Sequence, residues 1–392
     1  MNLDFKWIES HAADDTFQLR LKYGKEHADD ILQIEMRRKH AHKFADTLSK
    51  FPQFVFPSSL SAEQSTSDRL AEFHATLIEP GSSVADLTAG MGIDTLALAR
   101  KASEIVSVEI NPETAIALER NTAHLHNVTA ITGDCTEQVE QWIDRGRRFD
   151  CVFIDPARRA ADGSRIYSLA QCEPNVLDII PQLKRITSKL IIKASPMLDI
   201  NACIKALDPY VDQIVALGTT TECKELVIVC NLSHTQPVEA LIRAVTIAPE
   251  HTAEFSFTLS QEAAATAKFG EPHIDDYVFD PFPAVMKASP NKLLCEAFNI
   301  KKIAANTHLW FSHNPVEGFP GHTFRVLEIT PYMSKNIKRY SARFPKVGVS
   351  ALNFDITSDA LRTKLKVNEG PLRLFAVKTH TGQKLLITCQ RI

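Results

Sequence analysis

Short β-branched runs alternate with helical patterns between about residue 60 and residue 235, and this alternation limits the fold more than any other feature of the chain. Strands and helices that alternate at this spacing form a parallel sheet covered by helices on both faces. The sequence therefore predicts an α/β fold with a doubly wound sheet. Strands are expected at 83–87, 105–109, 129–132, 151–155, 190–193, 213–216 and 225–230.

The end of this α/β region is expected to depart from a purely parallel sheet. Residues 217–224 join the last two strands and are too few for a helical crossover, so those strands are expected to form a hairpin. The hairpin implies one antiparallel strand at the sheet edge. Strand patterns at 242–247 and 255–259 are expected to extend the sheet. Helices are expected at 94–101, 112–126 and 172–185.

Residues 84–100 form the most specific segment, a predicted strand, turn and helix. Gly90 and Gly92 in the turn would let the backbone pass close to a ligand, because no Cβ stands in the way. Free N–H groups at the helix start would then face that ligand. The NAD-binding fingerprint G-x-G-x-x-G needs Gly or Ala at position 95, where this chain has Thr95. The segment therefore predicts a ligand-binding turn that departs from the NAD pattern.

Acidic residues stand at the ends of four successive predicted strands, at Asp86, Glu109, Asp134 and Asp155. In a doubly wound sheet these ends converge on the crevice where ligands bind. Glu109 lies 23 positions after Asp86, where an acidic side chain can accept hydrogen bonds from both hydroxyls of a ribose. The pattern predicts a ligand site, and the alternative is that the four residues are solvated caps.

In order and spacing, these motifs resemble those of the class I S-adenosylmethionine-dependent methyltransferases, which have a Rossmann-like fold, over about residues 60–235. The resemblance implies S-adenosylmethionine as cofactor. It implies that Glu109 holds the ribose and that Asp134 accepts a hydrogen bond from the adenine amino group. The implied cofactor site consists of Asp86, Thr88, Ala89, Gly90, Gly92, Glu109, Asp134 and Asp155, and the first five line the amino-acid end of the cofactor.

Residues 155–158 resemble the D/N-P-P-Y motif of enzymes that methylate exocyclic amines on nucleic-acid bases, which implies Asp155, Pro156 and Arg158 as catalytic residues. An acidic side chain and a backbone carbonyl there can accept the hydrogens of the amine and aim its lone pair at the methyl group. Ala157 replaces the second proline, and Arg158 replaces the aromatic residue that stacks on the base. An arginine plane can stack on a base, bind phosphate or form a salt bridge across the site.

RNA uridine-C5 methyltransferases carry a related D-P-P-R motif and need a cysteine nucleophile after the next strand. In this chain that segment is 193–196, with Ser195 where a thiol is needed. Carbon methylation through a covalent adduct is therefore not expected. Direct displacement by a base nitrogen is expected instead.

The net charge of −3 hides an asymmetry. From Phe319 to Ile392 there are 13 Lys and Arg against 4 Asp and Glu, a net +9, which leaves −12 on the rest of the chain. A basic segment on an acidic body favours a polyanionic partner such as nucleic acid, although a well-solvated surface explains the charge equally.

A closer resemblance covers nearly the whole chain. Residues 60–66, 277–281 and 385–392 resemble segments of a group of bacterial candidate methyltransferases. Their small ferredoxin-like module and THUMP-like domain imply an RNA substrate, tRNA or rRNA. The predicted parts are an N-terminal helical segment at 1–57, the methyltransferase domain at 58–262, the ferredoxin-like module at 263–318 and a basic α+β THUMP-like domain at 319–392.

Cations and aromatic residues interleave in the basic domain, as expected for an RNA surface that holds phosphates and exposed bases. The aromatic residues are Tyr332, Tyr340 and Phe344, and core packing explains Phe344 as well as stacking does. The predicted RNA-binding residues are Lys335, Lys338, Arg339, Arg343 and Lys346.

The sequence also argues against several other classes of protein. None of the eight cysteines forms a C-x-x-C pair, and H-E-x-x-H is absent, so no metal is expected. Scattered cysteines in a large chain indicate the cytoplasm. The first residues lack the apolar core of a signal peptide, and no apolar run approaches the ~20 residues that span a bilayer.

The leading hypothesis is an S-adenosylmethionine-dependent methyltransferase that modifies a base nitrogen in rRNA or tRNA. Two alternatives remain. One is a non-catalytic RNA-binding or assembly factor on a methyltransferase fold, and the other is a methyltransferase acting on protein or a small molecule. The sequence predicts neither the modified position nor the oligomeric state.

Overall fold

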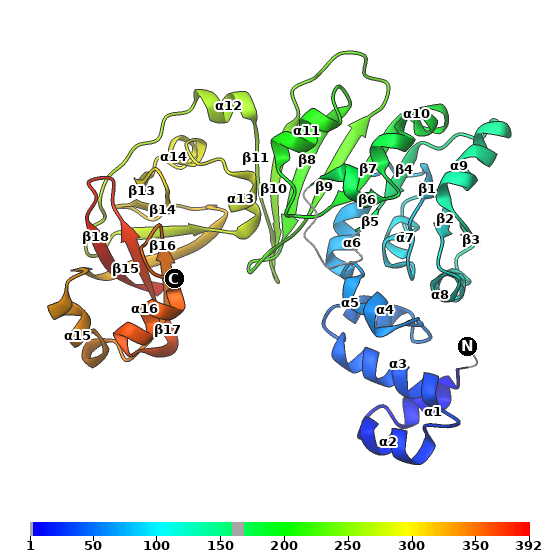
Figure 1. Cartoon of the computed structure of the whole chain (residues 1–392), viewed down its shortest axis with the longest axis horizontal. Helices are drawn as coiled ribbons and strands as arrows, with labels where there is room; N and C mark the ends of the chain where they lie inside the picture. Colours follow the sequence, from blue (N-terminus) through cyan, green and yellow to red (C-terminus); the bar gives the residue numbers. More distant parts are fainter. Residues whose placement is uncertain (1–2, 159–167) are drawn as a thin grey trace. The chain divides into compact units, whose positions relative to one another are not determined.

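The computed structural model of the protein describes residues 3–158 and 168–392 (Figure 1). The chain divides into two compact units. The first contains residues 1–212 and 227–238, and the second contains 213–226 and 239–392. No helix among the described residues is both long enough and apolar enough to cross a membrane.

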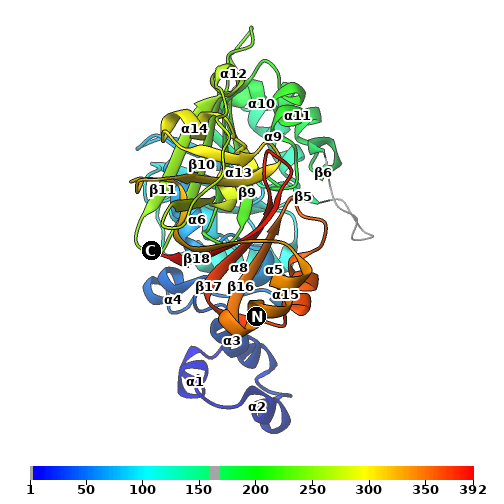
Figure 2. The ribbon, with the colours of Figure 1, turned by 90° about the vertical axis from the view of Figure 1, so that its left-hand side faces the viewer.

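The N-terminal segment is helical, as predicted, but it is broken into short helices. Two of them begin at an aspartate whose carboxylate accepts a backbone N–H of the first turn, Asp4 for α1 and Asp15 for α2. Ile31 and Ile34 are buried in a small core with Ile8. Both views show α1–α3 projecting from the rest of the first unit (Figure 2). These helices are α1 (Phe5–Ser10), α2 (Thr16–Tyr23), α3 (Ala28–Lys39) and α4 (Ala45–Lys50).

A nine-stranded sheet follows, in the order β11-β10-β8-β9-β7-β4-β1-β2-β3. The chain runs outward from β1 to β3 and then returns to β4 and β7, and neighbouring strands of this part pair in parallel. The strands are β1 (Ser83–Asp86), β2 (Glu104–Glu109), β3 (Val128–Thr132), β4 (Cys151–Ile154), β7 (Lys189–Ala194), β8 (Val211–Gly218), β9 (Cys223–Asn231), β10 (Leu241–Ile247) and β11 (Thr252–Thr258). The predicted doubly wound α/β fold is confirmed.

Helices precede this sheet and connect its strands. They are α5 (Ser59–Gln64), α6 (Asp68–Ala75), α7 (Ile93–Leu98), α8 (Pro112–Thr122), α9 (Cys135–Asp144), α10 (Val176–Ile186) and α11 (Ile200–Ala206). Helix α10 begins later than predicted, because β6 (Cys172–Glu173) first pairs with β5 (Ala157–Arg158). Asn175 then caps the helix by accepting the N–H of Leu177.

The prediction about the antiparallel strand needs a correction. Strands β8 and β9 are neighbours joined by only four residues, as expected for a hairpin, but β9 lies between β7 and β8 inside the sheet. Strands β10 and β11 extend the sheet beyond β8, and the antiparallel strand at the edge is β11. Local spacing revealed the hairpin, whereas its place in the sheet depends on pairings between distant segments.

The second unit contains a seven-stranded sheet in the order β13-β14-β12-β15-β18-β17-β16. Its strands are β12 (Tyr277–Pro281), β13 (Lys301–Ala304), β14 (Thr307–Ser312), β15 (Gly321–Pro331), β16 (Lys346–Leu352), β17 (Asn368–Lys378) and β18 (Lys384–Arg391). Strand β15 pairs with both β12 and β18. The residues on either side of position 320 therefore share one sheet.

Helices of this unit are α12 (Leu259–Ala264), α13 (Pro283–Ala288), α14 (Leu293–Ala297), α15 (Ser334–Arg343) and α16 (Ser358–Leu365). Residues 319–392 contain both helices and strands, as expected for an α+β domain, but α15 was not predicted. Its many cations conceal the apolar stripe of Ile337, Tyr340 and Phe344, which packs against the core beneath it.

Candidate active site

The four predicted acidic residues lie at one edge of the nine-stranded sheet. Asp86 and Glu109 end β1 and β2, Asp155 follows β4 directly, and Asp134 follows β3 by two residues. Strands β1 and β4 are neighbours from which the chain continues in opposite directions, and ligands bind at such a switch point in open α/β sheets. The fold therefore brings the predicted carboxylates to the edge where a ligand is expected.

The turn after β1 has the backbone that its glycines predicted. Gly90 and Gly92 have φ of 57° and 96°, in the region that disfavours residues with a Cβ. A Cβ on Gly92 would stand 2.9 Å from Cδ1 of the buried Leu118, so a larger residue at this position would force the Leu118 side chain to shift. Nothing lies within 4 Å of a Cβ built on Gly90, so the described part of the chain leaves open space there. Ala89 N–H donates to Val108 O at 2.9 Å and anchors the turn on β2.

Asp86 is buried with one carboxylate oxygen lacking a partner. The side chain of Thr95 donates to its Oδ2 at 2.6 Å, whereas Oδ1 accepts no hydrogen bond from the described residues. Burial raises the pKa of Asp86 to about 7. The NAD fingerprint has Gly or Ala at the position of Thr95. In this chain the Thr95 hydroxyl is needed for the hydrogen bond to Asp86, which explains the difference.

The carboxylates of Glu109 and Asp134 each accept hydrogen bonds from backbone N–H groups of nearby turns and helix starts. Glu109 accepts from Gly90 N–H at 2.9 Å and from Asn111 N–H at 2.7 Å, so it fixes the glycine turn. Asp134 caps α9, because its Oδ1 accepts from the N–H and hydroxyl of Thr136 at 2.7 and 2.6 Å. The hydroxyl bond from Thr136 lowers the pKa of Asp134. Asp134 therefore already has the capping role that was the alternative to ligand binding.

Asp155 joins the loops on the two sides of the switch point. Its N–H donates to Thr88 Oγ1 at 2.6 Å, and its Oδ2 accepts from Lys193 Nζ at 2.6 Å. The Asp155 side chain is 46% exposed, so a substrate can reach it, while Pro156 behind it is buried. The backbone of Arg158 pairs with Cys172, but the Arg158 side chain lies outside the described part of the structure.

Lys193 belongs to a buried polar network that the sequence patterns did not indicate. Its Nζ contacts Thr66 Oγ1 at 2.5 Å and Asp94 Oδ2 at 3.1 Å as well as Asp155. Asp94 Oδ1 also lies 2.7 Å from Nδ1 of the fully buried His74. Burial opposes ionisation of Asp94, but Lys193, His74 and Thr66 together lower the pKa of this carboxyl below its usual range. The sequence did contain one signal for this network: Lys193 stands near the end of a buried strand, and the acidic Asp155 stands at the end of the neighbouring strand.

No cysteine is placed as a nucleophile beside Asp155 in the segment after β7. Ser195 occupies that segment, and its Oγ accepts from Met197 N–H at 3.3 Å. Cys151 on β4 is buried, and burial raises the pKa of its thiol to about 12. A thiol with so high a pKa is inert at neutral pH.

The predicted RNA-binding cations lie on and just after α15. Lys335, Lys338 and Arg339 are exposed, stand at helical spacings of three and four, and make no ion pair with any described residue. We call these three residues the α15 cation row. Arg343 continues the row but forms a salt bridge with Glu328, and Lys346 is exposed at the start of β16.

The prediction that Tyr340 belongs to an RNA-binding surface is wrong. Its side chain is 3% exposed and its hydroxyl is 2.7 Å from Thr388 Oγ1, so it belongs to the core and cannot stack on a base. Phe344 and Tyr332 are partly buried against the same core. The helical period places the aromatic residues inside and the cations outside, which leaves a surface suited to phosphates rather than to bases.

Comparisons with protein families identify three segments. Residues 68–171 match the family described as Conserved hypothetical protein 95, residues 277–320 match a ferredoxin-like domain, and residues 321–391 match a THUMP domain-like family. The two C-terminal matches meet between residues 320 and 321, where β15 begins.

Known proteins resemble either nearly the whole chain or a shorter part of it. A crystal structure of a candidate methyltransferase from Porphyromonas gingivalis W83 has 28% identity, covers 99% of this chain and 97% of its own, and superposes with a TM-score of 0.88. An uncharacterised RNA methyltransferase of Geobacter sulfurreducens is 31% identical over 94 residues, 24% of this chain. The 23S rRNA (uracil(1939)-C(5))-methyltransferase RlmD of Cronobacter sakazakii is 40% identical over 93 residues, 22% of this chain.

The matches to curated relatives are partial, because they span 19% and 20% of the lengths of these two RNA methyltransferases. Together with the full-length structural match, however, the family matches confirm the resemblance expected from the sequence. The chain resembles a candidate methyltransferase over nearly its whole length and carries ferredoxin-like and THUMP-like segments at 277–320 and 321–391.

Proposed function

We propose that this protein is an S-adenosylmethionine-dependent methyltransferase that methylates a base nitrogen in rRNA or tRNA. The observation that carries the proposal is the set of acidic residues at four strand ends, among which Asp86 Oδ1 is buried and accepts no hydrogen bond from the described residues. A buried carboxylate oxygen without a donor is costly, and a ligand that supplies the donor removes the cost.

The residues around the switch point fit this cofactor. Asp86 Oδ1 can accept from the ammonium group of its amino-acid end, and the open space at Gly90 leaves room beside the backbone. Thr88, Ala89 and Gly92 would also line the amino-acid end of the cofactor. Glu109 would hold the ribose, and Asp134 would contact the adenine. When bound, the cofactor supplies a methyl group on a sulfonium centre, which a positioned nucleophile can displace.

Asp155 is the proposed residue for orienting the target amine. Within the described part of the chain its Oδ2 is held by Lys193 and no hydrogen bond reaches its Oδ1, so one oxygen can accept a hydrogen of the amine. The Lys193 contact fixes the position of the carboxylate, which suits orientation of the amine rather than removal of its proton. Pro156 makes the turn rigid, and Arg158 is proposed to contact the base or a phosphate.

Nitrogen rather than carbon is proposed as the methylated atom because Ser195 stands where a C5 methyltransferase needs a thiol. The similarity to a uracil-C5 methyltransferase favours carbon as the second candidate. A trapped covalent complex with 5-fluorouridine-containing RNA would support carbon, and its absence together with methyl transfer would support nitrogen.

The α15 cation row, Arg343 and Lys346 are proposed to hold the phosphates of the RNA. Lysine and arginine side chains without carboxylate partners are available to phosphate, and the α15 cation row has no carboxylate partner among the described residues.

The proposal also includes the domain boundaries expected from the sequence, which lie after residues 57, 262 and 318.

Binding of S-adenosylmethionine tests the first step of the proposal. Isothermal titration should show one site in the full chain, and Asp86→Ala should weaken binding by about 10- to 100-fold, because a charged hydrogen bond contributes about 1.5–3 kcal/mol. Asp150→Ala is the matched control, since this exposed carboxylate accepts a hydrogen bond from Ser83 N–H at the first residue of β1, at the other end of the strand from Asp86. No binding by the wild-type chain would favour a non-catalytic RNA-binding factor.

The substrate is best identified from cells that lack the protein. Mass spectrometry of rRNA and tRNA nucleosides should show one methylated base missing, and expression of the wild-type chain should restore it. Asp155→Ala should fail to restore the methyl mark while it still binds cofactor. An unchanged RNA profile, with a missing methyl group on a protein or small molecule, would contradict the RNA assignment.

A further inference from the structure

A cluster of two histidines and an aspartate lies in the second unit, far in sequence from the proposed active site. His273 and Asp276 stand just before β12, and His313 follows β14. One ligand atom from each of the three lies within 4.8 Å of the others. We propose that His273, Asp276 and His313 bind a divalent transition-metal ion, with Zn²⁺ as the best fit.

The sheet register explains why distant residues meet here. Strands β12 and β14 are antiparallel, and Tyr277 pairs with Ser312. The next residues outward are Asp276 and His313, which continue the same register beyond the strands and face each other. His313 Nδ1 lies 2.6 Å from Asp276 Oδ1. The pair is therefore held by the sheet framework and does not depend on a loose loop.

His273 reaches the pair through a tight turn. Its N–H donates to Asp276 Oδ2 at 2.7 Å, and Asp276 N–H donates back to His273 O at 3.2 Å. Asp275 inside this turn has a φ of 72°, and its N–H donates to Val326 O on β15. The turn brings His273 Nδ1 to 3.6 Å from Asp276 Oδ2.

These separations suit a metal ion after small side-chain movements. Zn²⁺ binds histidine nitrogen and carboxylate oxygen at about 2.0–2.2 Å, and tetrahedral angles then place ligand atoms about 3.4 Å apart. The observed separations of 2.6 and 3.6 Å lie on either side of this value. Two imidazoles and one carboxylate favour zinc, iron, nickel or copper over magnesium or calcium, which prefer ligand sets of oxygen alone.

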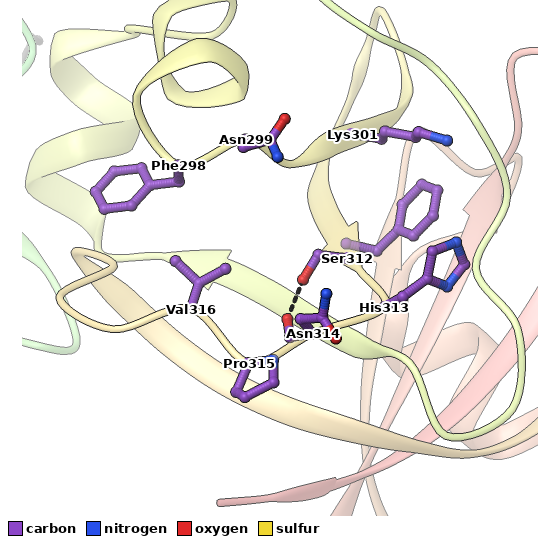
Figure 3. A pocket seen from close by; sticks show the side chains of 9 residues that line it. Phe298, Asn299, Lys301, Ser312, His313, Asn314, Pro315 and Val316 are labelled. Atoms are coloured by element: carbon purple, nitrogen blue, oxygen red, sulfur yellow. Dashed lines mark hydrogen bonds between the residues drawn. The ribbon is translucent and has the colours of Figure 1, made fainter.

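The exposure of the cluster allows an ion to enter. Asp276 is buried, with 7% of its side chain exposed, while the side chains of His273 and His313 are 75% and 61% exposed. Three protein ligands leave the fourth tetrahedral position for water or another ligand. His313 also lines a cavity of about 380 Å³ with Ser312, Asn314 and Lys301 (Figure 3).

Zinc titration of the full, tag-free chain after chelator treatment tests this proposal. We expect one Zn²⁺ per chain by isothermal titration, and visible absorption of four- or five-coordinate Co²⁺ when cobalt replaces zinc. Loss of a residue that only hydrogen-bonds to a metal ligand costs roughly 10–100-fold in metal affinity, so His273→Gln and His313→Gln, which remove a ligand itself, should each weaken zinc binding by more than this. Because ligands must be deprotonated, affinity should fall as the pH is lowered.

His234→Gln is the matched control. His234 Nε2 lies 2.6 Å from Asp212 Oδ1, the same separation as in the His313–Asp276 pair, and it should bind no metal because no third ligand stands beside this pair among the described residues. Wild-type affinity in this variant, with loss in the other two, supports the site. Absence of zinc binding in the wild type, or binding that survives both His273→Gln and His313→Gln, overturns the proposal and leaves a hydrogen-bonded turn. Both histidines are exposed, so these variants should fold, which circular dichroism checks.

Discussion

Replacement of Asp86 by asparagine should stabilise the protein at neutral pH, although it removes a proposed cofactor contact. Asp86 is 1% exposed, and burial raises its pKa from 3.8 to about 7. The folded state therefore disfavours the ionised carboxylate. Asparagine keeps an acceptor for the Thr95 hydroxyl and carries no charge, so it removes the desolvation cost.

The pH dependence follows from the direction of this shift. Because the folded pKa lies above the unfolded one, the folded state holds the proton more tightly, and the cost develops as the pH rises from about 4 to about 7. At 1.36 kcal/mol for each pKa unit, it reaches about 4 kcal/mol above pH 7. Wild type and Asp86→Asn should therefore be equally stable near pH 4 and differ by about 4 kcal/mol at pH 8.

Urea denaturation from pH 5 to pH 8 measures this difference. Pulsed hydrogen–deuterium exchange of peptides from β1 and α9 would report the first unit separately from the second, since the chain need not unfold in one step. A stability difference that is the same at pH 5 and pH 8 would refute the reasoning, because it would mean that Asp86 ionises without cost. Saturating cofactor should reduce the difference if its ammonium group pairs with Asp86.

Three further predictions rest on the same contacts. Affinity for S-adenosylmethionine should fall by up to tenfold for each unit that the pH is lowered below about 7 in the wild type, because the ammonium group pairs with the ionised Asp86, and Asp86→Asn should flatten this fall in isothermal titration. Lys193→Met should destabilise the protein by about 3–5 kcal/mol in urea, because it leaves the buried Asp94 without its cation; a change under 1 kcal/mol would contradict the network. Alanine at all three positions of the α15 cation row should lower the salt slope of RNA binding by up to about 2–3, whereas Arg343→Ala should change it less because Glu328 already neutralises Arg343.

Local sequence determined the strand–helix alternation, the glycine turn and the acidic strand ends. These features follow from residues close together in the chain: β-branched runs form strands, and Gly90 and Gly92 accept positive φ. The position of Asp86 and Glu109 at strand ends could also be predicted, because all parallel strands of a doubly wound sheet end at one edge.

Features that depend on contacts between distant segments could not be predicted from local patterns. Burial separated Tyr340 from the exposed cations of its own helix, and sheet order placed β9 inside the sheet. Lys193 meets Asp94 from 99 positions away, and His313 meets Asp276 from 37. No spacing rule spans such distances, because strand register and side-chain packing fix these pairs, and both exist only once the chain has folded.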